Sequence, residues 1–280
     1  MKSIGIDIGG TKTSIGIIDF KTGEISQKIE FLSKSYKNDK ENLNKIVNNA
    51  KDLAIRNKIK HIGIGVPELI DNQGIIKGSY NFKWHNLNFK NYFDKNTKVL
   101  VDSDVRNHLR AEKLLGHGVG KENFIYINIG TGISYAHIFK NQIFNGYRGY
   151  AIHFGSSVIE LNDFKKKKSF SQIPEDFYSG KAISKMLKNI KTKKHKNLYF
   201  KIISKSLASM IGNLINTIDP GFVVLGGGVI LNNKEFTKKL INDSKNFIIA
   251  HDAKKMKFHI SKLKKDAGLI GAGLLFKKFI

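Results

Sequence analysis

A glycine-tipped hairpin pattern occurs twice in this chain, about 120 residues apart, and it limits the folds the chain can adopt. Residues 4–18 and 124–138 are each an apolar, β-branched run that stops at two glycines and then resumes, which is typical of two strands joined by a tight turn. Glycines at such a tip let backbone N–H groups approach an anion closely. Two such tips predict two related halves that hold one polyphosphate from both sides. The alternative is that both are ordinary hairpin turns.

The residues at these tips are the candidate phosphate-binding groups, and the threonine hydroxyls among them add donors. They are Gly9, Gly10, Thr11, Lys12, Thr13, Gly130, Thr131 and Gly132. Asp7 stands just ahead of the first tip, where a carboxylate could hold Mg²⁺ through water, because this ion keeps several of its waters. The alternatives are that Asp7 accepts hydrogen bonds from turn N–H groups and that Lys12 is a solvated turn lysine.

A third glycine cluster, Gly226, Gly227 and Gly228, follows a turn at 219–221 and a short apolar strand at 222–225. A junction of this kind lets a flat ligand or a phosphate lie against the backbone. On this motif alone, an ordinary loop after a strand remains the alternative.

These motifs occur in the order found in the actin/Hsp70/sugar-kinase superfamily, and within it the chain resembles the ROK family of sugar kinases and repressors. The resemblance covers nearly the whole chain, and 7–13 is its most specific segment. It implies ATP and Mg²⁺ as cofactors, adenosine near Gly226–Gly228, and a homodimer. The other segments that carry it are Gly63–Pro67 with Asp71 and Gly74, Asn81 with Trp84, Gly130–Gly132, His153, Ser179–Gly180 and Leu225–Gly228.

Composition narrows the class of protein. The 280 residues are 41% hydrophobic, have no cysteine and carry a formal charge of +25. They therefore predict a globular chain without disulfides or thiolate metal sites. No apolar stretch is long enough for a membrane span and no leader pattern precedes the first strand, so we expect a cytoplasmic protein without a membrane partner. The basic residues are almost all lysine, whereas arginine is the residue preferred for contacts with nucleic-acid bases. The positive charge therefore indicates a bias in the composition of the genome rather than a specific nucleic-acid partner.

Alternating strand and helix patterns favour α/β layers. The resemblance implies a two-domain ribonuclease-H-like (actin-like ATPase) fold with a cleft between duplicated halves. We expect an N-terminal domain of 1–118 with the C-terminal helix 265–280, and a C-terminal domain of 119–264. The lysine runs 165–168 and 188–196 are expected to be solvated loops. Strands are predicted near 2–8, 14–19, 25–32, 61–66, 99–101, 123–139 (a hairpin), 222–225 and 257–260, and helices near 40–57, 104–116, 180–189, 197–218, 234–248 and from about 266.

Asp104 is the candidate catalytic base. It follows the strand 99–101 and opens a helix. The segment Asp102–Asp104 lies where the resembling family carries Glu-Asn-Asp, and Asp104 matches the catalytic aspartate. Phosphoryl transfer to a hydroxyl needs a base for the hydroxyl proton. The alternative is that Asp104 is only a helix N-cap.

The expected sugar-binding residues are Glu68, Asn81, Ser103, Asp104, Tyr150 and His153. Several of these positions depart from the family pattern. Ser103 and Arg106 stand where it has asparagines, Tyr150 where it has a glutamate, and Glu68 where it has a glycine. Serine and tyrosine cannot replace an amide or a carboxylate in kind, so we expect altered discrimination. The family's cysteine-rich zinc loop is missing after His153, so we expect no zinc site.

Together these features predict an ATP-dependent kinase that phosphorylates a hydroxyl of a sugar or amino sugar. The main alternative is a non-catalytic regulator that binds a nucleotide or sugar on the same scaffold. The altered sugar positions favour the regulator, whereas Asp104 and the complete first phosphate motif favour the kinase. A nucleic-acid-binding protein is a third possibility that rests on charge alone.

Overall fold

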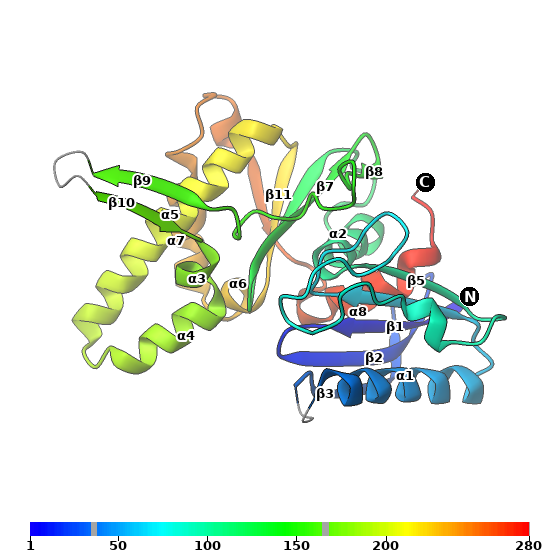
Figure 1. Cartoon of the computed structure of the whole chain (residues 1–280). Helices are drawn as coiled ribbons and strands as arrows, with labels where there is room; N and C mark the ends of the chain where they lie inside the picture. The colour runs from blue at the N-terminus through cyan, green and yellow to red at the C-terminus, as the bar shows by residue number, and fades with distance from the viewer. Residues whose placement is uncertain (35–37, 164–167, 280) are drawn as a thin grey trace. The chain divides into compact units, whose positions relative to one another are not determined.

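The chain forms two compact units (Figure 1), in a computed structural model that describes residues 1–34, 38–163 and 168–279. The first unit comprises Met1–Glu122, Ala136–Ile152 and Ser261–Ile280, and the second Asn123–Tyr135 and His153–Ile260. The expected domain bounds, 1–118 with 265–280 and 119–264, stay a prediction.

A five-stranded sheet with the order β3-β2-β1-β4-β5 forms the centre of the first unit. β1 is antiparallel to β2 and parallel to β4, and β4 is parallel to β5. The carboxyl ends of β1, β4 and β5 therefore lie at one edge of the sheet, with Asp7, Gly65 and Asp102 in register across them. The strands are β1 (Lys2–Ile8), β2 (Lys12–Asp19), β3 (Ile25–Leu32), β4 (His61–Val66) and β5 (Lys98–Ser103).

The alternation along β1 decides what covers each face of this sheet. Ile4, Ile6 and Ile8 are fully buried in one apolar cluster with residues of α1 (Asp39–Arg56). On the other face a Cβ on Gly5 would lie 2.5 Å from the Leu269 carbonyl oxygen in α8 (Ala267–Gly273). Glycine there lets the helix backbone lie directly on the strand. α2 (Asp104–Leu115) begins where β5 ends and packs against α8.

A second five-stranded sheet has the order β12-β11-β6-β7-β8, and β11 is parallel to both β6 and β12. The long helix α5 (Lys193–Ile218) buries an apolar stripe at a spacing of four residues, Ile203, Leu207, Ile211 and Ile215, as an amphipathic helix should. The strands are β6 (Phe124–Ile129), β7 (Ile133–Phe139), β8 (Gln142–Ile143), β11 (Phe222–Gly226) and β12 (Lys257–Ile260).

Among the described residues, the second unit also contains a two-stranded hairpin and further helices, whereas β8 belongs to the first unit. The hairpin strands and these helices are β9 (Ile159–Asp163), β10 (Lys168–Gln172), α3 (Glu175–Tyr178), α4 (Gly180–Asn189), α6 (Gly228–Asn232) and α7 (Lys234–Lys245).

The strands and most of the helices expected from the sequence are present with small shifts at their ends. The C-terminal helix is shorter than expected, because α8 ends at Gly273 and a 3-10 turn, Leu274–Phe276, follows it. The sequence did not predict β9, β10, α3 or α6. The expectation of a loop over 188–196 is wrong, because α4 runs to Asn189 and α5 begins at Lys193, where Thr192 caps the helix by accepting from the His195 N–H. Most of the run 165–168 lies outside the described residues. No helix in the described part of the chain has the length and apolar character needed to cross a membrane.

Candidate active site

The first glycine tip is held by its own turn and by Ser33, which follows β3. The Gly9 N–H donates to the Lys12 carbonyl at 2.9 Å across the turn, and the Ser33 N–H donates to the Thr11 carbonyl at 2.9 Å. Two of the residues expected to bind phosphate face elsewhere. The Thr13 hydroxyl is buried 2.8 Å from the Ser33 hydroxyl, and the Lys12 ammonium lies 2.7 Å from Glu30. Gly9, Gly10 and Thr11 therefore make up the accessible tip.

Asp7 is the penultimate residue of β1, just ahead of this tip, on the face that α8 covers. A Cβ on Gly268 would lie 2.5 Å from Asp7 Oδ2, so a glycine is needed there to leave room for the carboxylate. Burial raises the pKa of the Asp7 carboxyl, while the charges of His108 and Lys28 partly oppose that shift. The buried Asn107 Nδ2 has no hydrogen-bond partner among the described residues, and it lies above Gly65, the residue that pairs with Asp7 in β4.

Asp104 is the first residue of α2 and is partly exposed. Its Oδ1 accepts from the Val105 N–H at 2.7 Å, and its backbone carbonyl lies 2.7 Å from His108 Nδ1. The N-cap, however, is Ser103, whose hydroxyl accepts from the Arg106 N–H. Asp104 is therefore not the N-cap residue, although its carboxylate accepts one N–H of the first helical turn. Ser103 is fully buried in this role, so it offers no exposed hydroxyl to a sugar.

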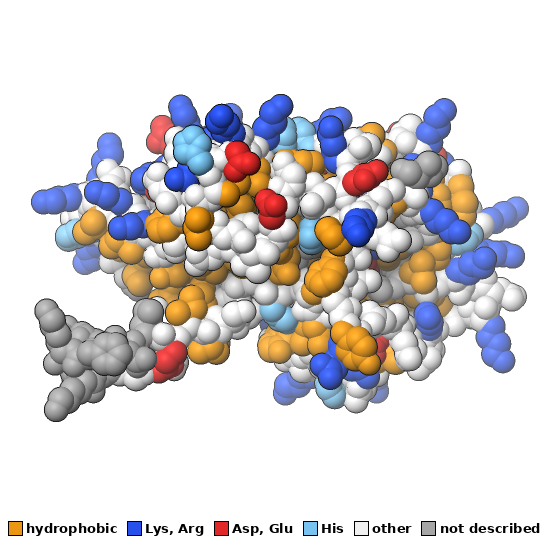
Figure 2. Space-filling view, turned by 90° about the horizontal axis from the view of Figure 1, so that it is seen from above, with side chains coloured by type: hydrophobic (Ala, Val, Ile, Leu, Met, Phe, Trp, Pro, Cys, Tyr) orange, Lys and Arg blue, Asp and Glu red, His pale blue; other side chains and the backbone are white. Residues whose placement is uncertain are grey.

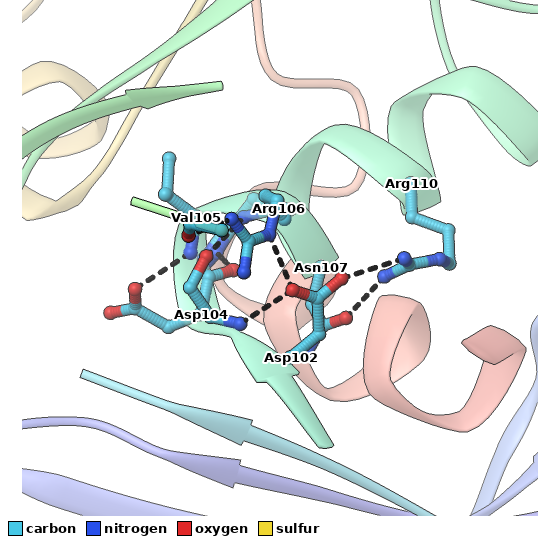
Figure 3. A network of polar contacts seen from close by, with 9 residues as sticks. Asp102, Asp104, Val105, Arg106, Asn107 and Arg110 are labelled. Atoms are coloured by element: carbon cyan, nitrogen blue, oxygen red, sulfur yellow. Dashed lines mark hydrogen bonds and ion pairs between the residues drawn. The ribbon is translucent and has the colours of Figure 1, made fainter. Parts of the chain in front are cut away.

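A buried ionic network lies directly beneath Asp104 (Figure 3). Asp102 accepts from Arg106 Nε through one carboxylate oxygen and from Arg110 Nη2 at 2.8 Å through the other. Burial raises the pKa of the Asp102 carboxyl, but the charges of Arg106 and Arg110 outweigh it and hold that pKa below its usual value. Asp102 is therefore ionised, and both of its carboxylate oxygens are engaged by the two arginines.

Glu68 does not present a free carboxylate to a substrate. It is only 3% exposed, and its two oxygens accept the N–H groups of Tyr80, Asn81 and Phe82 at 2.8, 2.6 and 3.0 Å. Glu68 therefore fixes the backbone of the 80–82 loop, and its expected contact with a sugar stays a prediction. Asn81 is partly exposed on this loop, and its Nδ2 donates to the Pro67 carbonyl at 2.8 Å, which leaves its Oδ1 as the remaining polar atom.

The second glycine tip, in the second unit, is held by residues distant in sequence. Glu175 Oε2 accepts the Ile133 N–H at 2.6 Å, and a Cβ on Gly132 would lie 2.8 Å from the same oxygen. The Gly180 N–H donates to the Gly130 carbonyl at 2.7 Å. Thr131 is exposed between the two glycines. The first turns of α3 and α4 thus brace this tip.

Residues 3–279 match the model of the ROK family. The chain belongs to the ROK family. The glucokinase of Thermotoga maritima is 25% identical to it over 100% of this chain and 98% of that protein. The xylose repressor of Bacillus subtilis is 28% identical over 60% of this chain and 48% of the repressor. The structure of a ROK family glucokinase from Streptomyces griseus in complex with glucose and AMPPNP has a TM-score of 0.80 at 19% identity, covering 98% of this chain and 99% of that one.

These comparisons confirm the predicted family and fold class: the chain is an α/β ROK protein with the actin-like ATPase fold. The remaining expected site residues lie in both units of this ROK protein. Tyr150 is in the first unit, and His153 is in the second, where its Nδ1 lies 2.7 Å from the Ser156 hydroxyl. Gly226 and Gly227 have a packing reason to be glycine, because Cβ atoms there would overlap the Tyr126 ring and the Ile129 carbonyl. Their expected place near adenosine stays a prediction.

Two features of this ROK protein bear on the expected metals and nucleic acid. No group of three or more acidic or histidine side chains suited to a metal ion occurs among the residues that the structure describes. On the face seen in Figure 2, lysine and arginine side chains are scattered rather than gathered into one patch. The expectation of no specific nucleic-acid partner stays a prediction.

Sequence reasoning missed the structural roles of two acidic residues. Asp102 was noted only as part of the motif, although Arg106 and Arg110 lie four residues apart on α2, soon after Asp102 in β5, and this spacing could have signalled the network. Glu175 carries no such signal, because it lies far from Gly132 in sequence.

Proposed function

We propose that this ROK protein is an ATP-dependent kinase that transfers a phosphoryl group to a hydroxyl of a sugar or amino sugar. The observation that carries the proposal is the state of Asp104. It stands just after the carboxyl end of β5 and at the start of α2, is partly exposed, and is not the N-cap residue, which is Ser103. The full-length similarity to a glucokinase supports the same reaction class.

In this proposal Asp104 accepts the proton of the attacking hydroxyl while that oxygen forms its bond to phosphorus. A carboxylate suits this task because phosphoryl transfer depends mainly on positioning, with the base orienting the nucleophile. Asp102 stays ionised because it accepts hydrogen bonds from Arg106 and Arg110, so it does not compete with Asp104 for that proton. Asn81 and Tyr150 are the polar side chains of the first unit that we expect to meet the sugar.

The residues present fit ATP with Mg²⁺. Burial raises the pKa of Asp7, so a cation beside it would relieve the cost of its charge, and the unpartnered Asn107 Nδ2 nearby can donate to an oxygen. Mg²⁺ commonly uses one or two carboxylates plus phosphates and waters, so Asp7 could serve as one of its carboxylates. When bound, Mg²⁺ would neutralise phosphate charge. Within the first unit, Gly9, Gly10 and Thr11 would bind phosphate, and the expectation that Gly130, Thr131 and Gly132 also bind phosphate stays a prediction.

A regulator without catalysis is the second candidate. The burial of two expected sugar-binding residues favours it: Glu68 and Ser103 are both buried and hydrogen-bonded within the fold. The xylose repressor matches over part of the chain and supports it too. Such a protein would bind a nucleotide or sugar and release no ADP.

The experiment that tests the proposal is a screen of hexoses, N-acetylated amino sugars and nucleosides for sugar-dependent ADP release. Wild type is compared with Asp104→Asn, and ATP binding is measured by calorimetry on both proteins. Turnover with one sugar in the wild type and its loss in Asp104→Asn, with ATP binding kept, supports a kinase. ATP or sugar binding without any turnover across the screen supports the regulator instead.

A further inference from the structure

Arg106 stands where the resembling family has an asparagine, yet its side chain does not face an open site. It is 3% exposed, its Nε donates to Asp102, and its Nη1 donates to the Gly149 carbonyl at 2.8 Å (Figure 3). A planar guanidinium has donors in a fixed fork, so one side chain can hold a carboxylate and a carbonyl in a set relation. Arg106 therefore joins the start of α2 to the loop that contains Tyr150.

This loop is fixed at further points within the first unit. Gly149 has a φ of +88°, and a Cβ there would lie 2.5 Å from the Ile70 carbonyl oxygen. The Asn72 side chain donates to the Tyr147 carbonyl at 2.9 Å. The 70–72 segment therefore holds one side of the loop, and Arg106 supplies the hydrogen bond from the side of α2.

Asp102 keeps the Arg106 side chain in this direction. Its second oxygen accepts from Arg110, and its first also accepts the Ser103 N–H at 2.8 Å. Removing one partner from a buried ionic group leaves an uncompensated charge, so the arrangement is strongly specified. Arg110 has the same ionic partner as Arg106, but its hydrogen bonds run to Asp102 and Asn107 and not to the 145–150 loop.

We propose that Arg106 is a positioning residue that sets acceptor specificity: through the Gly149 carbonyl it fixes the 145–150 loop, and with it Tyr150, relative to the start of α2 that carries Asp104. The inference rests on the proposed kinase function. It assigns recognition of the acceptor sugar near Asp104 to the Tyr150 loop rather than to the side chain of residue 106. The variants that test it are Arg106→Met, Arg106→Lys and the matched control Arg110→Met.

The first measurement is amide hydrogen exchange of the 145–150 loop, which needs no turnover. Arg106→Met should speed exchange in this loop, because the Gly149 carbonyl loses its donor. Arg110→Met also loses an ionic partner of Asp102, but it should leave exchange in the loop near the wild-type rate. Equal exchange in the loop for wild type and Arg106→Met, or equal acceleration in both variants, would overturn the proposal.

The second measurement separates acceptor from nucleotide. Arg106→Met should raise the KM for the acceptor by about tenfold or more, since small misplacements of binding groups are costly, while the KM for ATP stays within about twofold. Arg106→Lys keeps the charge beside Asp102 but lacks the several N–H donors of the guanidinium. Its acceptor KM should therefore lie between those of wild type and Arg106→Met. Arg110→Met should lower the melting temperature without this shift in acceptor KM. A parallel rise in both KM values for Arg106→Met would show a merely structural role and contradict the proposal.

If the wild type phosphorylates no sugar, the proposed function fails but the loop claim is still decided. Sugar affinity measured by calorimetry then replaces KM, and hydrogen exchange is read as before. Faster exchange in Arg106→Met with weaker sugar binding would keep Arg106 as a positioning residue in a binding protein. Unchanged exchange would reject it whatever the activity.

Discussion

The two glycine tips have similar sequences but are supported differently. The first, at Gly9–Thr11, is closed by a hydrogen bond within its own turn and by the end of the neighbouring strand β3. The second, at Gly130–Gly132, has a similar internal bond from the Gly130 N–H to the Gly132 carbonyl at 2.9 Å. It is additionally held by Glu175 and Gly180, which come from two helices far along the chain.

The difference teaches that a local motif predicts the turn but not what fixes it. The turn that joins β1 to β2 and the residue that follows β3 fix the first tip. The residues that determine its shape therefore lie close to it in the sequence. The second tip places a carboxylate, Glu175, against the backbone of Ile133, close to where an anion is expected to bind. We therefore expect the first tip to tolerate changes elsewhere in the chain and the second to depend on α3.

The largest effect should come from stopping the chemistry without touching either tip. Asp104→Asn keeps the shape of the side chain and leaves the Ser103 cap in place, but it removes the basic carboxylate. Turnover should fall by about 10²-fold or more, the usual range for a general base. ATP affinity and melting temperature should stay close to wild type, measured by calorimetry and thermal unfolding. If the melting temperature collapses as well, Asp104 is mainly structural.

Replacing glycine at each tip should reveal the difference in support. Gly10→Val puts a branched side chain where phosphate is expected to approach, so Mg·ATP binding should be lost while the melting temperature is kept. Gly132→Val should lose Mg·ATP binding and also lower the melting temperature, because its Cβ would lie 2.8 Å from the Glu175 carboxylate. Calorimetry at millimolar nucleotide and thermal unfolding read the two effects. Normal ATP binding by Gly10→Val would show that the first tip does not bind phosphate.

Removing one carboxylate beside each tip should give a smaller, contrasting effect. Glu175→Ala removes the acceptor of the Ile133 N–H, so ATP affinity should fall by about tenfold, as for a lost charge-assisted hydrogen bond. Glu175→Gln keeps an acceptor oxygen and should restore much of that affinity. The matched change Glu30→Ala releases Lys12 at the first tip and should leave ATP binding unchanged or slightly tighter. Equal losses from Glu175→Ala and Glu30→Ala would remove the contrast between the tips.

Most of the fold could be predicted from the sequence because its signals are local. The apolar alternation in β1 and the helical spacing in α5 each report one element and the face it buries. The elements that were missed, such as β9, β10 and α6, are short and carry no comparable periodicity. A short segment is decided by its neighbours in space, which the pattern of residues does not show.

The candidate site was predictable only where one residue acts from one position. Asp104 follows a strand and opens a helix, and it stands there as expected. The inward roles of Glu68 and Ser103 were not visible, because burial depends on which loop folds over each side chain. A glutamate is rarely buried unless it is paired, and only the structure reveals that the N–H groups of 80–82 pair with Glu68.

The smallest expected effect is a difference in pH dependence between the two tips. At the first tip, the hydrogen bond from Lys12 leads the contacts that lower the pKa of Glu30 to about 2. A carboxylate whose pKa is lowered by folding stabilises the fold at every pH above its pKa in the unfolded chain. That contribution is lost only as the pH falls toward about 2. At the second, burial lowers the pKa of His153, and the charge of Glu175 only partly opposes it. A histidine held neutral costs stability as the pH falls through its pKa in the unfolded chain, about 6.5.

His153→Gln should therefore raise the melting temperature relative to wild type more at pH 5.5 than at pH 8, whereas Glu30→Gln should differ from wild type by the same amount at both pH values. Differences from wild type are needed because burial also lowers the pKa of His61 and His137. A His153→Gln difference that does not change with pH would show that the second unit does not respond to protonation at this histidine.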